Sequence, residues 1–375
     1  MKKAQTTLQL NKVLSDEFSS AFIKDFFDKN YTGKKYLFGL NPLAADFAQE
    51  LNIDGFVTTK SRKTEFLGKK VVLLENVQTE DLVLVCETNG AAAVERLLAG
   101  CSFRHMDCFS FSIRTKSSVN VYHFSGWAED IEKNFSKYQK IFSMLADEES
   151  KLVFYNLVNF KFSGDMRYLK DFEINVQSGQ SEQSAQPEQM QYFEPFLNLP
   201  EKPVFVDAGG FTGDTTLQFI QKYPDYSAVY LFEPEPHFLK KAEASLKNYR
   251  NIVFIAKGLS DKKATVRFSS KGLASCIDKD GETEIETDTL DNCISVETKI
   301  DFIKMDIEGE ESAAISGAAA TIKKNRPVLA VCVYHKPDDF WKIPEQVLSI
   351  YSGYSIFMRH YSEVSDETVM FFIPR

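Results

Sequence analysis

The sequence has little of several features that mark particular classes of protein. Basic residues are outnumbered: 44 lysines and arginines against 53 aspartates and glutamates give a net charge of −9. A protein that follows a nucleic-acid backbone usually presents a basic surface, so no nucleic-acid partner is expected. The longest apolar runs, such as Val328–Val333, fall far short of the ~20 residues that a membrane span needs. Met1–Thr7 also lacks the apolar stretch of a secretion signal, which indicates a cytoplasmic protein.

Cysteine is sparse as well. The six cysteines include no C-x-x-C pair, and Cys86 and Cys332 lie inside apolar runs. This pattern predicts buried free thiols in a reducing compartment. At roughly 150 residues per domain, the length of 375 residues predicts two to three domains.

Three segments precede the region that is richest in motifs. Residues 1–32 have apolar side chains at helical spacing and predict a helical lead-in. Residues 33–125 alternate short apolar strands with helices, which predicts a small Rossmann-like α/β domain whose last strand is Met106–Ser110. Residues 126–192 predict a helical connector with a mobile Gln/Ser-rich loop at 175–191, which could be a lid or an inert surface loop.

The first turn of the small domain resembles a dinucleotide-binding turn that has lost its key positions. Gly39–Ala44 departs from G-x-G-x-x-G/A because Asn41 replaces the middle glycine. Pro42 removes a backbone N–H near the place where a phosphate would need donors. We therefore expect no cofactor in this domain, which leaves docking, homo-oligomerisation or substrate positioning as its role.

Residues 193–375 predict a larger α/β domain. Five strands alternate with helices and a closing pair of strands follows, so the pattern predicts a seven-stranded Rossmann-like sheet. One helix is expected over Glu311–Lys323. The expected strands are Val204–Asp207, Val229–Phe232, Ile252–Ala256, Phe302–Met305, Val328–Val333, Ser355–Arg359 and Thr368–Ile373.

A glycine-rich turn follows the first of these strands. The strand ends in Asp207, and the pattern D-x-G-x-x-x-G then leads into a helix. Glycines in this turn allow a close approach to a ligand and tight packing of the helix start. Asp207 could accept from an ammonium group while the helix N-terminus donates to a carboxylate, which suits the methionine end of S-adenosylmethionine. The candidate cofactor-binding residues here are Asp207, Gly209, Gly210, Phe211, Gly213 and Thr215.

The next strand also ends in an acidic residue, Glu233. Such a carboxylate bonds the ribose hydroxyls of an adenosine, in NAD sites as well as in S-adenosylmethionine sites. The dinucleotide spacing G-x-G-x-x-G is absent after Asp207, so the turn favours S-adenosylmethionine. The further cofactor candidates are Pro234 and, in the turn after the third strand, Gly258, Leu259 and Ser260.

A dense group of carboxylates follows the strand Phe302–Met305. Asp and Glu stabilise a helix N-terminus, which accounts for Glu310 and Glu311. Asp306 and Glu308 instead stand at the strand tip, where open α/β sheets bind ligands, and Asp306 is also a cofactor candidate. The following strand ends near His335, a candidate catalytic group.

These motifs closely resemble the FkbM family of S-adenosylmethionine-dependent methyltransferases. The resemblance is carried by Phe205–Thr216, Phe232–Pro234 and Ile303–Gly309, and extends to Tyr334–Pro344 and Arg359–Tyr361. It is strong over about 190–375 and slight over 1–125. The resemblance implies O-methylation of a hydroxyl on a sugar, glycan, lipid or secondary-metabolite acceptor.

An alcohol is a poor nucleophile until it is deprotonated, so a base is expected near the acceptor. We hypothesise that His335 is this base, with Asp306 or Glu308 orienting it or binding the acceptor. A divalent metal held by the same three residues is a less favoured version, because their spacing is not diagnostic. The alternatives of other classes are an NAD(P)-linked sugar-modifying oxidoreductase, led by residues 33–113, and a non-catalytic assembly protein with a vestigial cofactor site.

Overall fold

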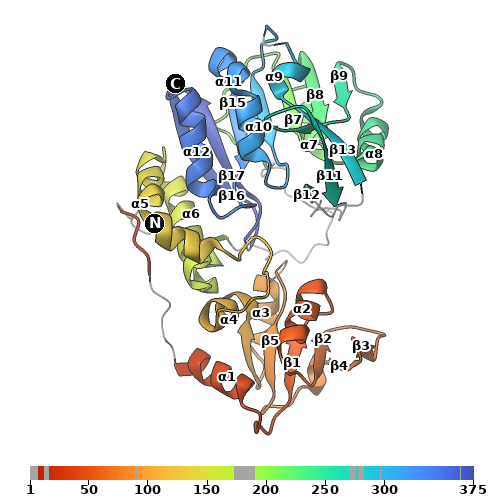
Figure 1. Ribbon diagram of the computed structural model, residues 1–375, viewed down its shortest axis with the longest axis vertical. Helices are drawn as coiled ribbons and strands as arrows, with labels where there is room; N and C mark the ends of the chain where they lie inside the picture. The colour runs from red at the N-terminus through yellow and green to blue at the C-terminus, as the bar shows by residue number, and fades with distance from the viewer. Residues whose placement is uncertain are drawn as a thin grey trace.

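Two large β-sheets joined by a pair of helices organise the chain (Figure 1). The computed structural model describes residues 7–11, 17–88, 91–172, 191–269, 276–277, 283–295, 297–363 and 365–375. The Gln/Ser-rich loop predicted at 175–191 lies outside the described residues, apart from Gln191. In the described part, no helix is long and apolar enough to cross a membrane.

The N-terminal sheet is mostly parallel, as the alternation of strands and helices predicted. Its strands are β1 (Lys35–Phe38), β2 (Gly55–Thr58), β3 (Glu65–Phe66), β4 (Lys69–Leu73), β5 (Leu82–Val85) and β6 (Arg104–Asp107), and its helices are α1 (Glu17–Phe27), α2 (Pro42–Glu50), α3 (Ala91–Leu98) and α4 (Cys108–Thr115). The strand order is β3-β4-β2-β1-β5-β6, and β3 pairs antiparallel with β4. A short 3₁₀ turn, η1 (Leu74–Asn76), follows β4.

The last strand of this sheet ends earlier than predicted. It was expected to continue to Ser110, but β6 stops at Asp107. The Asp107 carboxylate accepts a hydrogen bond from the backbone N–H of Ser110 at 2.7 Å and caps α4. Because an aspartate at this position satisfies a free N–H of the first helical turn, the chain enters a helix there instead of extending the strand.

Asn41 has a structural role in the turn that resembles a dinucleotide site. Its side chain accepts a hydrogen bond from the backbone N–H of Ala44 at 2.9 Å and donates to the carbonyl of Cys86 at 2.8 Å. Pro42 is the first residue of α2, where a missing N–H costs nothing. Asn41 therefore caps α2 and ties the turn to the end of β5.

The predicted helical connector consists of α5 (Trp127–Met144), α6 (Glu148–Ser163) and the 3₁₀ helix η2 (Met166–Phe172). Figure 1 shows α5 and α6 beside the C-terminal sheet, on the side that faces the N-terminal unit. Their buried aromatic side chains, including Trp127, Tyr138 and Phe154, belong to one apolar core that continues from the N-terminal sheet into the C-terminal sheet. The two sheets are thus packed through the connector.

The C-terminal sheet has seven strands, as predicted. They are β7 (Val204–Ala208), β8 (Ala228–Phe232), β9 (Ile252–Ile255), β14 (Phe302–Met305), β15 (Val328–Cys332), β16 (Tyr354–His360) and β17 (Thr368–Pro374). Their order is β16-β17-β15-β14-β7-β8-β9, with β17 antiparallel to both neighbours. The chain runs from β7 outward to β8 and β9 and then returns to β14 on the other side. Such a reversal opens a crevice beyond the carboxyl ends of the central strands.

Helices cover both faces of this sheet. They are α7 (Asp214–Lys222), α8 (Pro236–Leu246), α9 (Leu290–Cys293), α10 (Glu311–Gly317), α11 (Ala319–Asn325) and α12 (Asp339–Ile350). A four-stranded sheet made of β10 (Gly258–Leu259), β11 (Ala264–Ser269), β12 (Cys276–Ile277) and β13 (Thr283–Asp288) lies at its edge.

The single helix predicted over Glu311–Lys323 is divided in the structure. Ala318 leaves the helical region, with φ −110° and ψ 9°, and separates α10 from α11. The preceding residue, Gly317, packs so closely on Ser260 that a β-carbon would lie 2.0 Å from the Ser260 carbonyl oxygen. The break thus accompanies a tight contact between α10 and the turn after β10.

Candidate active site

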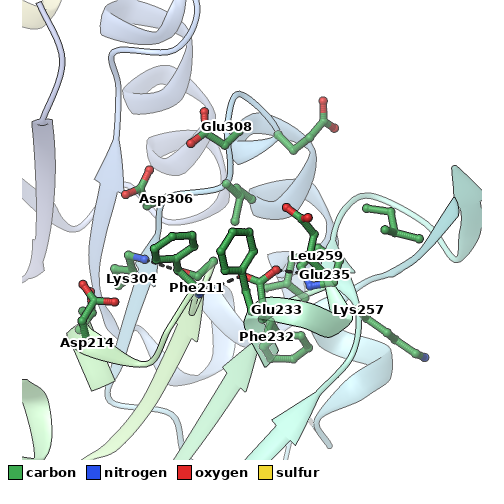
Figure 2. Close-up of a pocket in the computed structure, with 18 of the residues that line it drawn as sticks. Phe211, Asp214, Phe232, Glu233, Glu235, Lys257, Leu259, Lys304, Asp306 and Glu308 are labelled. Atoms are coloured by element: carbon green, nitrogen blue, oxygen red, sulfur yellow. Dashed lines mark hydrogen bonds between the residues drawn. The ribbon is translucent and has the colours of Figure 1, made fainter. Parts of the chain in front are cut away.

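A cavity of about 270 Å³ opens beyond the carboxyl ends of β7, β8 and β14. This volume lies just below the range of roughly 300–1,000 Å³ for small-molecule sites, so it suits one ligand of moderate size. Figure 2 shows Asp306 and Glu308 on one side of the cavity and Lys257 on the other. Eight of the predicted cofactor residues line it: Gly209, Phe211, Thr215, Glu233, Pro234, Gly258, Leu259 and Asp306.

The glycine turn after β7 brings two strand ends together. Gly209 has φ +81°, a conformation that favours glycine, and a β-carbon there would lie 1.9 Å from the carbonyl oxygen of Asp306. Gly210 and Gly213 were predicted to contact the cofactor as well, but they do not line the cavity. A β-carbon would meet Leu231 at Gly210 and Leu246 at Gly213, so these two glycines permit internal packing.

Glu233 lies at the tip of β8 and lines the cavity while its residue remains only 6% exposed. One carboxylate oxygen accepts from the backbone N–H of Phe211 and the other from that of Glu235, each at 2.9 Å. These bonds fix the carboxylate at the edge of the glycine turn (Figure 2). Burial raises the pKa of Glu233 to about 7, against the effect of the two backbone donors.

Asp207 does not line the cavity, although it was predicted to accept from a ligand ammonium. Its residue is fully buried, its Oδ2 accepts from the Thr216 hydroxyl at 2.7 Å, and its Oδ1 lies 3.2 Å from Lys304 Nζ. Lys304 Nζ also donates to the carbonyl of Gly209 at 2.7 Å. Asp207 therefore acts through Lys304 and α7, and Lys304 is the group of this pair that lines the cavity.

The turn after β9 contributes two of its three predicted residues. Gly258 and Leu259 line the cavity, whereas Ser260 does not. The backbone N–H of Ser260 donates to the carbonyl of Asp288 at 2.9 Å, which ties β10 to β13. Ser260 is therefore a structural residue of the small sheet.

Asp306 is held by two tyrosine hydroxyls. Tyr192 donates to its Oδ2 at 2.9 Å and Tyr334 to its Oδ1 at 3.3 Å. Burial favours the neutral acid, but the charges of Lys304 and His335 outweigh it and lower the pKa of Asp306. Asp306 is thus an ionised carboxylate with a fixed orientation at the cavity.

His335 lies behind the cavity wall and not on it. Its side chain is 4% exposed, with Nδ1 3.0 Å from Glu311 Oε1 and Nε2 3.6 Å from Asp306 Oδ1. Burial lowers the pKa of the ring, but the surrounding carboxylates outweigh this and raise it to about 10. The raised pKa favours the protonated ring at neutral pH, whereas the base hypothesised at His335 must be neutral to accept a proton.

Glu308 combines access with a shifted pKa. It lines the cavity, and its Oε2 lies 3.7 Å from His335 Nε2. Its φ is +55°, an uncommon conformation for a residue other than glycine. Burial raises the pKa of Glu308 to about 7, with the nearby His335 acting in the opposite direction. The pKa of Glu308 is therefore shifted toward the neutral range in which a general base works.

Asp306, Glu311 and His335 also form the kind of cluster that could hold a metal ion. One ligand atom from each lies within 4.8 Å of the others. This set differs from the one considered from the sequence, because Glu311 takes the place of Glu308.

Comparison with known families finds a match within the C-terminal part of the chain. Residues 207–362 match the family described as the methyltransferase FkbM domain. This region matches the FkbM methyltransferase domain, and we refer to it as the FkbM domain. The resemblance found in the sequence is thereby confirmed.

The fold of the FkbM domain and its N-terminal extension has a relative among solved structures. Methyltransferase FkbM from Methylobacillus flagellatus KT has a TM-score of 0.76 and 19% identity, and the match covers 95% of this chain and 93% of that one. At this identity the likeness shows the fold alone, which is the predicted Rossmann-like methyltransferase fold.

Two more distant structures cover about half of this chain. An rRNA methylase from Streptococcus thermophilus matches with 14% identity and a TM-score of 0.33, over 47% of this chain and 89% of its own. Fibrillarin from Aeropyrum pernix, solved with S-adenosyl-L-methionine, matches with 14% identity and a TM-score of 0.30, over 47% and 70%. No curated protein matches the sequence.

Sequence reasoning missed two side chains that shape the FkbM site. Lys304 is 3% exposed and lies within the buried strand β14. A lysine inside an apolar strand is rarely buried without a charged partner, so its position in the sequence could have predicted an ion pair with a carboxylate of a neighbouring strand. Tyr192 lines the cavity under Asp306, but nothing in its local sequence indicated this position.

Proposed function

We propose that this chain transfers a methyl group from S-adenosylmethionine to a hydroxyl group of a sugar, glycan, lipid or secondary-metabolite acceptor. The observation that carries the proposal is the cavity at the reversal point of the sheet, with Glu233 at the tip of β8 beside the glycine turn of β7. In open α/β sheets this is the position at which an adenosine is bound.

The lining residues divide the cavity into regions that suit the parts of S-adenosylmethionine. Glu233 would accept from the ribose hydroxyls, and Gly258 and Leu259 would contact the adenine. The first turn of α7, with Asp214 and Thr215, would hold the amino-acid end near the helix N-terminus. When bound, S-adenosylmethionine supplies the electrophilic methyl group.

The acceptor hydroxyl belongs at the carboxylate side of the cavity. There, the acceptor oxygen forms a bond to the methyl carbon as the carbon–sulfur bond breaks, and the hydroxyl proton passes to a base. Glu308 suits this role because it lines the cavity and has a pKa near neutrality. His335, which keeps its proton, would stabilise the ionised form of Glu308 from behind.

Isothermal titration of the purified protein with S-adenosylmethionine, S-adenosylhomocysteine and NADH tests the proposal. We expect the two adenosyl ligands to bind with micromolar dissociation constants, about −8 kcal/mol, and NADH not to bind. Binding of NADH alone would favour an oxidoreductase. Absence of binding by all three ligands would overturn the methyltransferase proposal. Tight binding with no transfer to any hydroxylated compound would favour the assembly protein with a vestigial site.

A further inference from the structure

The segment between α4 and α5 reaches the carboxylate side of the site from the N-terminal half of the chain. We call residues 116–126 the bridging loop. Val121 and Phe124 are buried in the apolar core, and Phe124 packs edge-on against Phe109 at 4.9 Å. Tyr122, between them, is 46% exposed. The loop is therefore anchored on both sides of an exposed aromatic ring.

A buried lysine fixes the backbone of this loop. Lys161 of α6 is fully buried, and its ammonium donates to the carbonyl oxygens of His123 and Ser365. It also lies 4.3 Å from the centre of the Trp127 ring, which provides a cation–π contact. Burial lowers the pKa of Lys161 to about 7. A buried amino group needs hydrogen-bond partners, and the two carbonyls supply them, so Lys161 holds the backbone of His123 in place.

Two adjacent side chains of the loop, Tyr122 and His123, contact the residues around Glu308 and His335. The His123 ring lies 4.9 Å from the Tyr334 ring and 5.4 Å from the His335 ring, between centroids. Its φ of +55° is uncommon for a residue other than glycine. The Tyr122 hydroxyl donates to Glu308 Oε2 at 3.4 Å, and its ring lies 3.8 Å from that of His123.

We propose that the bridging loop forms one wall of the acceptor site, with the Tyr122 ring contacting the acceptor and the Tyr122 hydroxyl orienting Glu308. This inference rests on the proposed function, because Glu308 is the proton acceptor in that reaction. It gives the N-terminal unit the substrate-positioning role, one of the three that the sequence left open.

The chemistry around Tyr122 suits a hydroxylated ring such as a pyranose. An aromatic face packs on the apolar C–H face of a sugar ring, and neighbouring carboxylates accept from its hydroxyls. Both groups are present here: the rings of Tyr122 and His123, 3.8 Å apart and tilted by 52°, lie just outside the cavity lining, and the carboxylates of Glu308 and Glu310 line the cavity. The buried Nδ1 of His123 has no hydrogen-bond partner among the described residues.

Saturation-transfer NMR tests whether the bridging loop contacts the acceptor, because it detects binding of a glycoside to the protein. The protein is first loaded with excess S-adenosylhomocysteine. The probes are methyl α-D-glucopyranoside, methyl α-D-mannopyranoside and methyl α-L-rhamnopyranoside. The variants are Tyr122→Ala and Tyr122→Phe, with Tyr249→Ala as the matched control because Tyr249 is also an exposed tyrosine, three residues beyond the end of α8. Circular dichroism confirms the fold of each variant.

We expect at least one glycoside to bind the native protein, and Tyr122→Ala to weaken that binding at least tenfold. Tyr122→Phe, which keeps the ring, should bind within about threefold of the native protein but turn over more slowly at saturating glycoside. Tyr249→Ala should behave as the native protein. Binding of S-adenosylhomocysteine with no glycoside bound, or equal glycoside binding by Tyr122→Ala, would overturn the inference and leave the methyltransferase proposal standing. Failure to bind S-adenosylhomocysteine would overturn both.

Discussion

Lys304 Nζ lies 3.2 Å from Asp207 Oδ1, and both side chains are buried. They come from β14 and β7, the adjacent central strands of the FkbM domain. The residues are direct neighbours in the β7–β14 register, so their side chains share one face of the sheet. Burial alone would lower the pKa of Lys304, but the charges of Asp207 and Asp306 raise it above its ordinary value. The ammonium therefore stays charged beneath the cavity and joins Asp207 to the glycine turn through the Gly209 carbonyl.

Replacing Lys304 with methionine should destabilise the protein by about 3–5 kcal/mol, because it leaves the Asp207 carboxylate buried without its partner. Urea unfolding followed by circular dichroism measures this free energy. Lys299→Met is the control: Lys299 pairs with Asp301 at 3.3 Å but is 74% exposed, so its loss should cost at most about 1 kcal/mol. Equal costs for the two variants would contradict the structural role of Lys304.

Replacing Glu233 with alanine should weaken S-adenosylmethionine binding by about 10- to 100-fold, because hydrogen bonds to the carboxylate are lost. Glu243→Ala, an exposed position on α8, should have no effect. The raised pKa of about 7 means that Glu233 is largely protonated below this value and charged above it. Binding should therefore tighten as pH rises through about 7. Titration calorimetry across this range, with a flat profile in Glu233→Ala, checks the assignment.

Glu308→Gln should lower kcat by about 10²–10⁴-fold and leave S-adenosylmethionine affinity unchanged, since it removes only the proton acceptor. In the native protein, kcat should rise with pH through about 7, as Glu308 ionises. This rise should vanish in the variant. Glu345→Gln, which alters an exposed ion pair with Lys140, serves as the control. A near-native kcat in Glu308→Gln would mean that another group accepts the proton of the acceptor hydroxyl.

The charge of His335 should make stability decline at alkaline pH. Its folded-state pKa is raised to about 10 from an ordinary value of 6.5, so the folded state binds the proton more tightly than the unfolded state. The contribution is complete below about pH 6.5 and is lost as pH rises toward about 10. Melting temperatures of the native protein and His335→Gln, measured over this range, should converge at the alkaline end. His237→Gln, at an exposed position, should follow the native curve throughout.

Exhaustive EDTA treatment should leave turnover unchanged. Metal coordination by this cluster would have to displace the contact between His335 Nδ1 and Glu311 Oε1, which lie 3.0 Å apart. Transfer of radiolabelled methyl groups before and after chelation measures this. A loss of activity that Mg²⁺ or Mn²⁺ restores would instead favour the metal-assisted mechanism through the cluster of Asp306, Glu311 and His335.

Local sequence predicted the parts of the site that local structure creates. Gly209, Glu233 and Asp306 all line the cavity, because each directly follows a buried strand of a sheet whose reversal point can be inferred from element order. The same reasoning predicted cavity positions for Asp207, Gly210 and Gly213, which lie beneath the cavity lining. A turn that lines a cavity and a turn that packs beneath one both favour glycine and a short polar residue, so the local sequence cannot distinguish them. The neighbours from other elements separate these two roles: Lys304 and Thr216 hold the Asp207 carboxylate, and Leu231 and Leu246 pack against Gly210 and Gly213.

By itself, the sequence determined most of the succession of strands and helices, the seven-stranded sheet and the position of the glycine turn, because hydrophobic periodicity and glycine placement act over short distances. Only the tertiary structure decided the pKa shifts of the buried groups and the contact of the bridging loop with Glu308. His335 keeps its proton because Glu311, Asp306 and Glu308 surround it in space. Tyr122 reaches Glu308 across 186 residues of sequence because the connector packs the two halves together. Electrostatic energy depends on distance in space and on burial, and neither can be read from spacing along the chain.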